Sequence, residues 1–170
     1  LELIAGRVPE DLEGVLYRNG PGRFEMGGRP YHHPFDGDGM IARLAIQDGQ
    51  VRYTNRFVES AEFLEELSHG RMRYRGFGTP RPGGLAGNAL RTHIKNAANT
   101  SVVRAGDDLL ALWEGGLPHA LDPGTLKTRR REDFDGALQN GRALDRLANP
   151  ELPFSAHPRR DPDTGTLYNF

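Results

Sequence analysis

The sequence contains no cysteine, which excludes a disulfide framework and any metal site built from thiolates. A transition metal would therefore have to be bound by imidazole or carboxylate groups. No stretch approaches the roughly 18 consecutive apolar residues of a membrane-spanning helix. Neither charge is in excess, because 22 Lys plus Arg face 23 Asp plus Glu. This balance, with the basic residues scattered along the chain, gives no reason to expect a nucleic-acid partner.

Several short catalytic motifs are also missing. The sequence has no Gly-x-Ser-x-Gly, no phosphate-binding P-loop and no Rossmann fingerprint, so hydrolase and nucleotide-dependent chemistry have no positive support. None of the six histidines has a second histidine four residues away, and no His-Glu-x-x-His is present. Metal ligands would therefore have to come from separate segments.

Glycine and proline are abundant, with 22 and 12 residues, whereas hydrophobic residues make up only 36% of the chain. Turn signals recur about every 8–15 residues between short runs of strand-forming residues. This pattern predicts an all-β antiparallel meander, which would form a sandwich, a barrel or a propeller. Two Asp-Pro turns about 40 residues apart, in 121–126 and 160–167, are what consecutive propeller blades would give.

The expected elements can be placed by their boundaries. Asp48-Gly49 predicts a type I′ hairpin turn. Ser60 is an expected helix N-cap, and Gly70 an expected helix end. Asn19-Gly-Pro21 predicts a turn, followed by a Gly-rich loop to Pro30. Strands are predicted over 40–46, 51–58, 100–103, 109–114, 120–121, 126–128 and 165–170, a helix over 60–69, and irregular structure over 76–95 and 133–153.

Three polar segments have alternative interpretations. Asp36-Gly-Asp-Gly39 could begin a calcium loop, but it lacks the later acidic ligands, which favours a tight turn with positive-φ glycines. The basic run at 127–131 is followed at once by two acids, which favours a solvated hairpin. Glu114 directly follows an apolar strand, so it is either a structural acid or a partner that orients a metal-binding imidazole.

Five motifs, in order, resemble those of the carotenoid cleavage oxygenase family. Together they extend over nearly the whole chain. They are Gly14-Val-Leu-Tyr-Arg-Asn-Gly-Pro21, His33-Pro-Phe-Asp-Gly-Asp-Gly-Met40, Lys95-Asn-Ala-Ala-Asn-Thr100, Leu110-Ala-Leu-Trp-Glu-Gly-Gly-Leu-Pro118 and Ser155-Ala-His-Pro158.

The resemblance implies a seven-bladed β-propeller with iron(II) on its axis, held by four histidines from separate blades. It implies that the enzyme adds O2 across a conjugated double bond of a carotenoid or apocarotenoid and releases two carbonyl fragments. His157 matches the first iron ligand, and Glu114 matches an acid that orients a ligand histidine. His33 matches a structural position, and the other four histidines match no functional position.

Several expectations follow from the resemblance. Because a strand is predicted to run to the last residue, we expect residues 1–170 to be the N-terminal part of a single propeller domain, about two blades, inactive when isolated. The alternatives are a stilbene-cleaving enzyme of the same family and a propeller scaffold that has lost the iron. The location is expected to be cytoplasmic or peripheral to a membrane, with Leu85, Leu90 and Ile94 as thin support for membrane contact.

Overall fold

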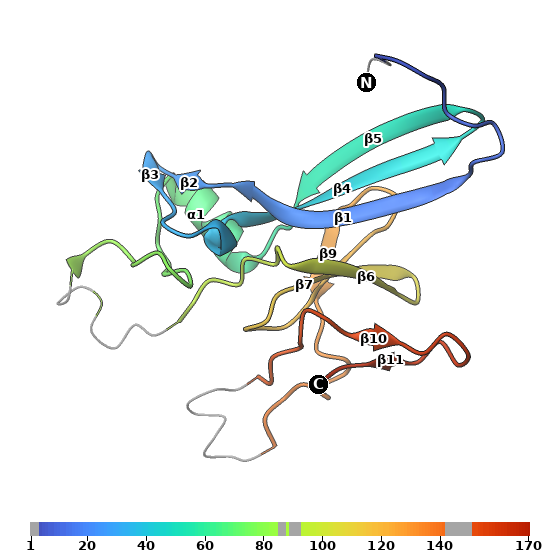
Figure 1. The fold of residues 1–170 in the computed structure, drawn as a ribbon. Coiled ribbons are helices and arrows are strands. Elements are labelled where there is room, and N and C mark those ends of the chain that lie inside the picture. The colour runs from blue at the N-terminus through green and yellow to red at the C-terminus, as the bar shows by residue number, and fades with distance from the viewer. Residues whose placement is uncertain (1–3, 85–87, 89–92, 142–150) are drawn as a thin grey trace.

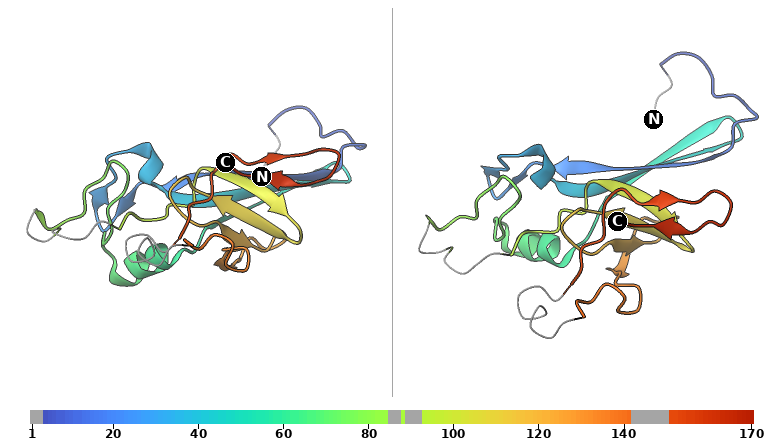
Figure 2. Two further views of the ribbon diagram at one scale, coloured as in Figure 1. Left: turned by 90° about the horizontal axis from the view of Figure 1, so that it is seen from below. Right: turned by 60° about the horizontal axis from the view of Figure 1, so that its bottom comes forward.

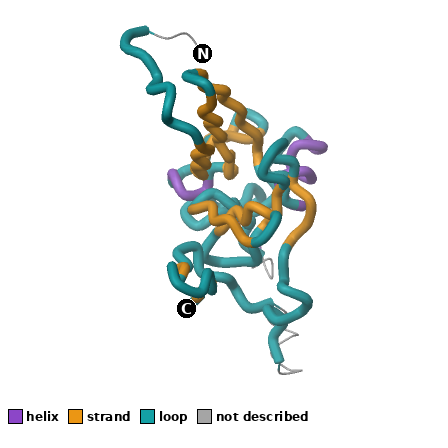
Figure 3. The backbone as a smooth tube through the Cα atoms, turned by 90° about the vertical axis from the view of Figure 1, so that its right-hand side faces the viewer, coloured by secondary structure: helices purple, strands orange, loops and turns teal. Residues whose placement is uncertain are grey.

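The computed structural model describes residues 4–84, 88, 93–141 and 151–170. Strands are the main regular secondary structure of these residues, and helical structure is limited to short segments (Figures 1 and 3), which confirms the all-β prediction. The elements are β1 (Gly14–Arg23), β2 (Glu25–Met26), β3 (Arg29–Pro30), the 3-10 turn η1 (Pro34–Asp36), β4 (Asp38–Gln47), β5 (Gln50–Phe57), α1 (Ala61–His69), β6 (Ser101–Ala105), β7 (Asp108–Leu112), β8 (His119–Leu121), β9 (Thr128–Arg131), β10 (Arg159–Arg160) and β11 (Leu167–Tyr168).

The strands form antiparallel sheets that follow one another in space. The first sheet has the order β1-β4-β5, and the second is the four-stranded meander β6-β7-β8-β9. The hairpin β10-β11 lies on the far side of the second sheet from the first (Figures 1 and 2). A four-stranded antiparallel meander is the unit of a propeller blade, so this stack agrees with the expected architecture.

The central strand β7 is buried on both faces. Leu109 and Ala111 belong to a core cluster between the first and second sheets. Leu110 and Leu112 belong to a second cluster on the opposite face, where they meet Phe154. Because side chains alternate along a strand, a continuous apolar run is what a strand enclosed by two neighbouring layers requires.

The predicted turn at Asn19-Gly-Pro21 is wrong, because these residues lie inside β1 and pair with β4. β1 is an edge strand, where a proline without an N–H does not break the ladder. The Asn19 side chain instead donates hydrogen bonds of 2.8 Å to the carbonyls of Ala98 and Ser101. The Gly-rich loop predicted to reach Pro30 also differs, since it contains the β2-β3 hairpin.

The predicted hairpin turn and helix ends are confirmed. Asp48 and Gly49 both have positive φ angles, 51° and 67°, as a type I′ turn requires. The Ser60 hydroxyl accepts a 3.1 Å hydrogen bond from the Phe63 N–H, and Gly70 ends α1 with a φ of 61°. Other boundaries shift by a few residues, and the last predicted strand is reduced to Leu167–Tyr168.

The Asp36–Gly39 segment departs from the predicted tight turn. Gly37 has a φ of −64°, and Gly39 lies within β4 rather than at a positive φ. A Cβ on Gly39 would lie 2.2 Å from the Ala98 carbonyl oxygen, so glycine is required there for close backbone approach. The Asp36 carboxylate accepts a 3.0 Å hydrogen bond from the Gly78 N–H, far along the chain, rather than from its own turn.

In both Asp-Pro turns the aspartate side chain accepts a hydrogen bond from a backbone N–H within the turn. The Asp122 carboxylate accepts a 2.7 Å hydrogen bond from the Thr125 N–H between β8 and β9. The Asp161 carboxylate accepts one of 2.8 Å from the Asp163 N–H between β10 and β11. The recurrence in sequence therefore corresponds to equivalent turns in adjacent layers. The basic run on β9 is a solvated hairpin, as predicted, because it is exposed and its arginines pair with carboxylates.

Candidate metal centre

Glu114 and His157 lie in different segments and meet in space. Glu114 lies in the turn that follows β7, and His157 precedes β10 by two residues. The His157 Nε2 atom lies 3.4 Å from the Glu114 Oε1 atom, and the two side chains are 69% and 55% exposed. This separation is slightly longer than an ordinary N–H···O hydrogen bond. The structure therefore places the two residues singled out by their motifs beside each other at an open edge.

Burial and local hydrogen bonds place His157 at this edge. Phe154 and Ala156 are buried in the second core cluster, whereas His157 is exposed. The Ser155 hydroxyl accepts a 3.3 Å hydrogen bond from the His157 N–H. The Asn169 side chain binds the Ser155 backbone at both its N–H and its carbonyl, at 3.1 and 3.0 Å.

The donor set fits one corner of an imidazole-ligated metal site. An iron(II) ion accepts neutral imidazole, and a carboxylate beside the ring orients it and raises its basicity. The described part of the chain holds no cluster of three or more His, Asp or Glu side chains that would bind a metal by itself. Among the described residues, His157 beside Glu114 is thus a candidate for one imidazole ligand of such a site.

The other histidines have different surroundings. The His33 Nδ1 atom accepts a 3.1 Å hydrogen bond from the Phe35 N–H, and its ring lies edge-on to Phe35 and Phe77. His33 therefore has the structural role that its motif predicted. His93 pairs with Glu62 at 2.9 Å on the surface.

Sequence reasoning did not single out His119, which is buried in β8. Its Nδ1 atom has no hydrogen-bond partner. It lines a cavity of about 950 Å³ together with Glu62, Trp113 and Arg131. The pKa of His119 is lowered to about 4, chiefly because the ring is buried; Glu62 partly opposes this shift, and Arg131 contributes a smaller lowering. No periodicity in the short segment 119–121 could have shown that the ring is enclosed.

His119 should make stability depend on pH. The unfolded imidazole binds a proton below its ordinary pKa of 6.5, whereas the folded one does so only below about 4. Between these values the unfolded state binds more protons, so the free energy of unfolding rises with pH, by at most about 1.4 kcal/mol per unit. Between pH 4 and 7, the urea concentration at the unfolding midpoint should depend less on pH in His119→Leu than in the parent. The exposed control His69→Leu should keep the pH dependence of the parent. Equal slopes in the parent and His119→Leu would contradict this assignment.

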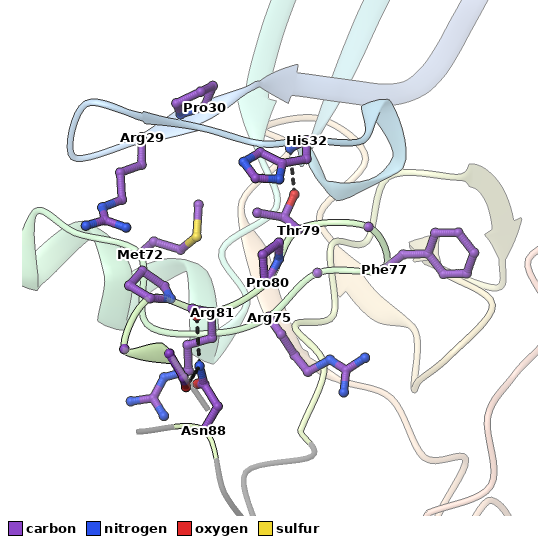
Figure 4. Close-up of a pocket in the computed structure, with 15 residues that line it drawn as sticks. Arg29, Pro30, His32, Met72, Arg75, Phe77, Thr79, Pro80, Arg81 and Asn88 are labelled. Atoms are coloured by element: carbon purple, nitrogen blue, oxygen red, sulfur yellow. Dashed lines mark hydrogen bonds between the residues drawn. The ribbon is translucent and has the colours of Figure 1, made fainter. Parts of the chain in front are cut away.

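A second cavity, of about 780 Å³, lies between the β2-β3 hairpin and residues 75–84 (Figure 4). The His32 backbone N–H donates a 2.7 Å hydrogen bond to the Thr79 hydroxyl across it. Arg29, Arg75 and Arg81 line it. The basic residues that look scattered in the sequence are thus partly gathered here, but neither Glu114 nor His157 lines this cavity.

In the described ranges, no helix has the length and apolar character needed to cross a membrane. Leu85 and Leu90, named as thin support for membrane contact, lie outside the described residues. Ile94 is half-buried and forms a β-bridge with Arg75. Membrane contact therefore stays a prediction.

Comparison with known proteins places these features in a family. The family model described as "Retinal pigment epithelial membrane protein" matches residues 1–170. The apocarotenoid-15,15′-oxygenase of Synechocystis is 45% identical over 164 residues, which cover 95% of this chain and 31% of that protein. Resveratrol cleavage oxygenase 1 of Aspergillus fumigatus is 33% identical over 177 residues, which cover 98% of this chain and 30% of that protein.

A solved structure agrees with the sequence matches. Cobalt-substituted Synechocystis apocarotenoid oxygenase superposes with a TM-score of 0.81 at 43% identity, covering 95% of this chain and 33% of that one. The chain thus spans about a third of the length of these relatives. It belongs to the retinal pigment epithelial membrane protein family, the group of carotenoid cleavage oxygenases whose motifs and β-propeller architecture it shares.

Proposed function

We propose that the complete protein containing this chain is a non-haem iron(II) dioxygenase. It would use O2 to cleave a conjugated carbon–carbon double bond of a carotenoid or apocarotenoid, giving two carbonyl products. The observation that carries the proposal is the contact between His157 and Glu114, 3.4 Å apart, in a chain 45% identical to an apocarotenoid oxygenase. The test is product analysis with the complete protein, iron(II), an apocarotenoid and ¹⁸O2: labelled carbonyl fragments support it, and intact substrate contradicts it.

The two residues have separate tasks in this proposal. His157 would bind iron(II) as one of its ligands through a neutral imidazole nitrogen. Iron, when bound, supplies the open coordination positions at which O2 is activated. Glu114 would orient a ligand histidine ring and increase its basicity, as carboxylates beside ligand histidines do. Keeping this carboxylate beside the ligand rather than on the iron leaves the ion its full positive charge.

A stilbene is the second candidate substrate, and a specific observation favours it: the relative from Aspergillus fumigatus is named for resveratrol cleavage. The higher identity to the apocarotenoid oxygenase ranks the polyene first. Parallel assays with an apocarotenoid and with resveratrol separate the two. Cleavage of neither, together with an absence of iron after reconstitution, would favour the scaffold alternative.

Glu114→Gln should weaken iron binding by about 10–100-fold, the usual effect of losing a partner that orients a metal ligand. The amide keeps the size of the side chain but loses the charge that polarises the ring. Competition with a chelator measures the change in dissociation constant. The control is Glu25→Gln, at the exposed position of β2. Equal affinity in Glu114→Gln and the parent would show that Glu114 has no part in metal binding.

The expected location of the protein follows from the proposed substrate. An apocarotenoid is lipophilic, so the protein would meet it at or near a membrane surface. Co-sedimentation with phospholipid vesicles tests a peripheral association, and binding that disappears with Leu85→Ser and Leu90→Ser would support the predicted contact. Binding equal to the parent in both variants would place the contact elsewhere.

A further inference from the structure

The linker 95–101 ends on Ser101, the first residue of β6. Its residues 95–99 are buried although they form no regular secondary structure. Asn96, Ala97, Ala98 and Asn99 are each at most 8% exposed. Side-chain hydrogen bonds replace the missing ladder: the Asn99 amide donates to the carbonyls of Phe35 and Gly37 at 2.8 and 2.7 Å. The bonds from Asn99 to Gly37, from Asn96 to Leu117 and from the Ala98 N–H to Asn96 are buried, where a hydrogen bond is stronger than in water, so they hold the segment in place.

One end of the linker holds the turn that contains Glu114. The Asn96 amide nitrogen donates a buried 2.9 Å hydrogen bond to the Leu117 carbonyl, and its oxygen accepts one of 3.0 Å from the Ala98 N–H. A Cβ on Gly116 would lie 2.7 Å from the Asn96 amide nitrogen. The turn and the linker therefore approach each other so closely that the Asn96 side chain fixes the turn.

The other end of the linker holds the segment that contains His157. The Ser101 hydroxyl donates a hydrogen bond to the carbonyl of Ala156, the residue directly before His157. The Ser101 carbonyl is itself fixed by the Asn19 amide of β1, at 2.8 Å. The same linker therefore fixes the segment of His157 and the segment of Glu114.

We propose that Asn96 and Ser101 are positioning residues that together hold the segments of Glu114 and His157 beside each other. The inference rests on the proposed function, because that function makes His157 a metal ligand and Glu114 an acid that orients a ligand histidine. Glu114 and His157 are both more than half exposed, so their own side-chain contacts do little to hold them. The shared linker fixes the backbone near Glu114 and the backbone near His157. The two side chains therefore keep a constant relative position although they are far apart in sequence.

The first test needs no metal. Hydrogen–deuterium exchange of the metal-free complete protein should become faster in peptide 113–118 for Asn96→Ala, and in peptide 154–158 for Ser101→Val. Ser101→Thr keeps the hydroxyl in a side chain with the shape of valine, so it should restore slow exchange. Asn55→Ala and Ser68→Ala change exposed residues of β5 and α1 and should leave both peptides unaffected. Unchanged exchange in both peptides would overturn the inference.

The second test connects the linker to the metal. Asn96→Ala and Ser101→Val should each weaken iron(II) binding by about 10–100-fold. Ser101→Thr should recover most of the lost affinity. Thermal unfolding of each variant separates weaker binding from loss of the fold. If the parent binds iron and both variants bind it with the same affinity, the inference is overturned and the proposed function stays intact. A parent that binds no iron overturns the proposed function, and the exchange experiment still decides whether the linker positions the two segments.

Discussion

Replacing Lys95 by methionine is expected to lower the free energy of unfolding by about 3–5 kcal/mol, the usual cost of leaving a buried charge unpaired. The Lys95 ammonium is bound to Asp38 and lies 2.7 Å from the Glu66 carboxylate. These three side chains are at most 6% exposed. Arg23, 2.7 Å from Asp38, completes a cluster whose charges cancel. Without the ammonium, two buried carboxylates would share a single guanidinium.

The protonation state of this cluster supports that expectation. Burial lowers the pKa of Lys95, but Asp38, Tyr31 and Glu66 oppose this effect, and the net shift is upward. Lys95 is therefore charged at neutral pH. Burial raises the pKa of Tyr31 to about 12, so its phenol stays neutral and accepts a 3.2 Å hydrogen bond from the ammonium.

Urea unfolding of the complete protein measures this effect. Lys127→Met, on the exposed β8-β9 hairpin, is the matched control and should change stability by less than about 0.5 kcal/mol. Glu66→Gln combined with Lys95→Met removes one of the unpaired carboxylates and should recover part of the loss. A loss below about 1 kcal/mol in Lys95→Met alone would show that the cluster is hydrated or rearranges.

Local signals in the sequence predicted the local structure well. Asp48-Gly49 and the caps of α1 act through backbone conformations and hydrogen bonds within a few residues, so their effect can be read directly. The apolar run in β7 indicated a buried strand. The five motifs located Glu114 and His157, and the structure added that the two side chains are neighbours.

Long-range features could not be predicted in this way. Asp38, Glu66 and Lys95 lie on three different segments, and nothing local indicates that charged residues will be buried together. Asn19-Gly-Pro21 has the composition of a turn, but pairing with β4 and the bonds from Asn19 to the linker override that preference. Asn96 and Ser101 are ordinary polar residues in sequence, and only the fold shows which carbonyls they hold.

His157→Ala is expected to have the largest functional effect, because it removes the proposed imidazole ligand that lies beside the Glu114 carboxylate. An iron(II) ion that loses a ligand nitrogen gains no substitute from the alanine methyl group, and Glu114 alone is a poor replacement in a site built from imidazoles. Oxidative cleavage should be lost with the metal. His69→Ala, at the exposed end of α1, is the control and should keep both iron and activity.

The most direct measurement is therefore the iron content of the complete protein, purified without oxygen, beside that of His157→Ala. About one iron per chain is expected in the parent, and a sharp loss in the variant. Iron retained unchanged in His157→Ala, or no iron in the reconstituted parent, would contradict the proposal that His157 is an iron ligand.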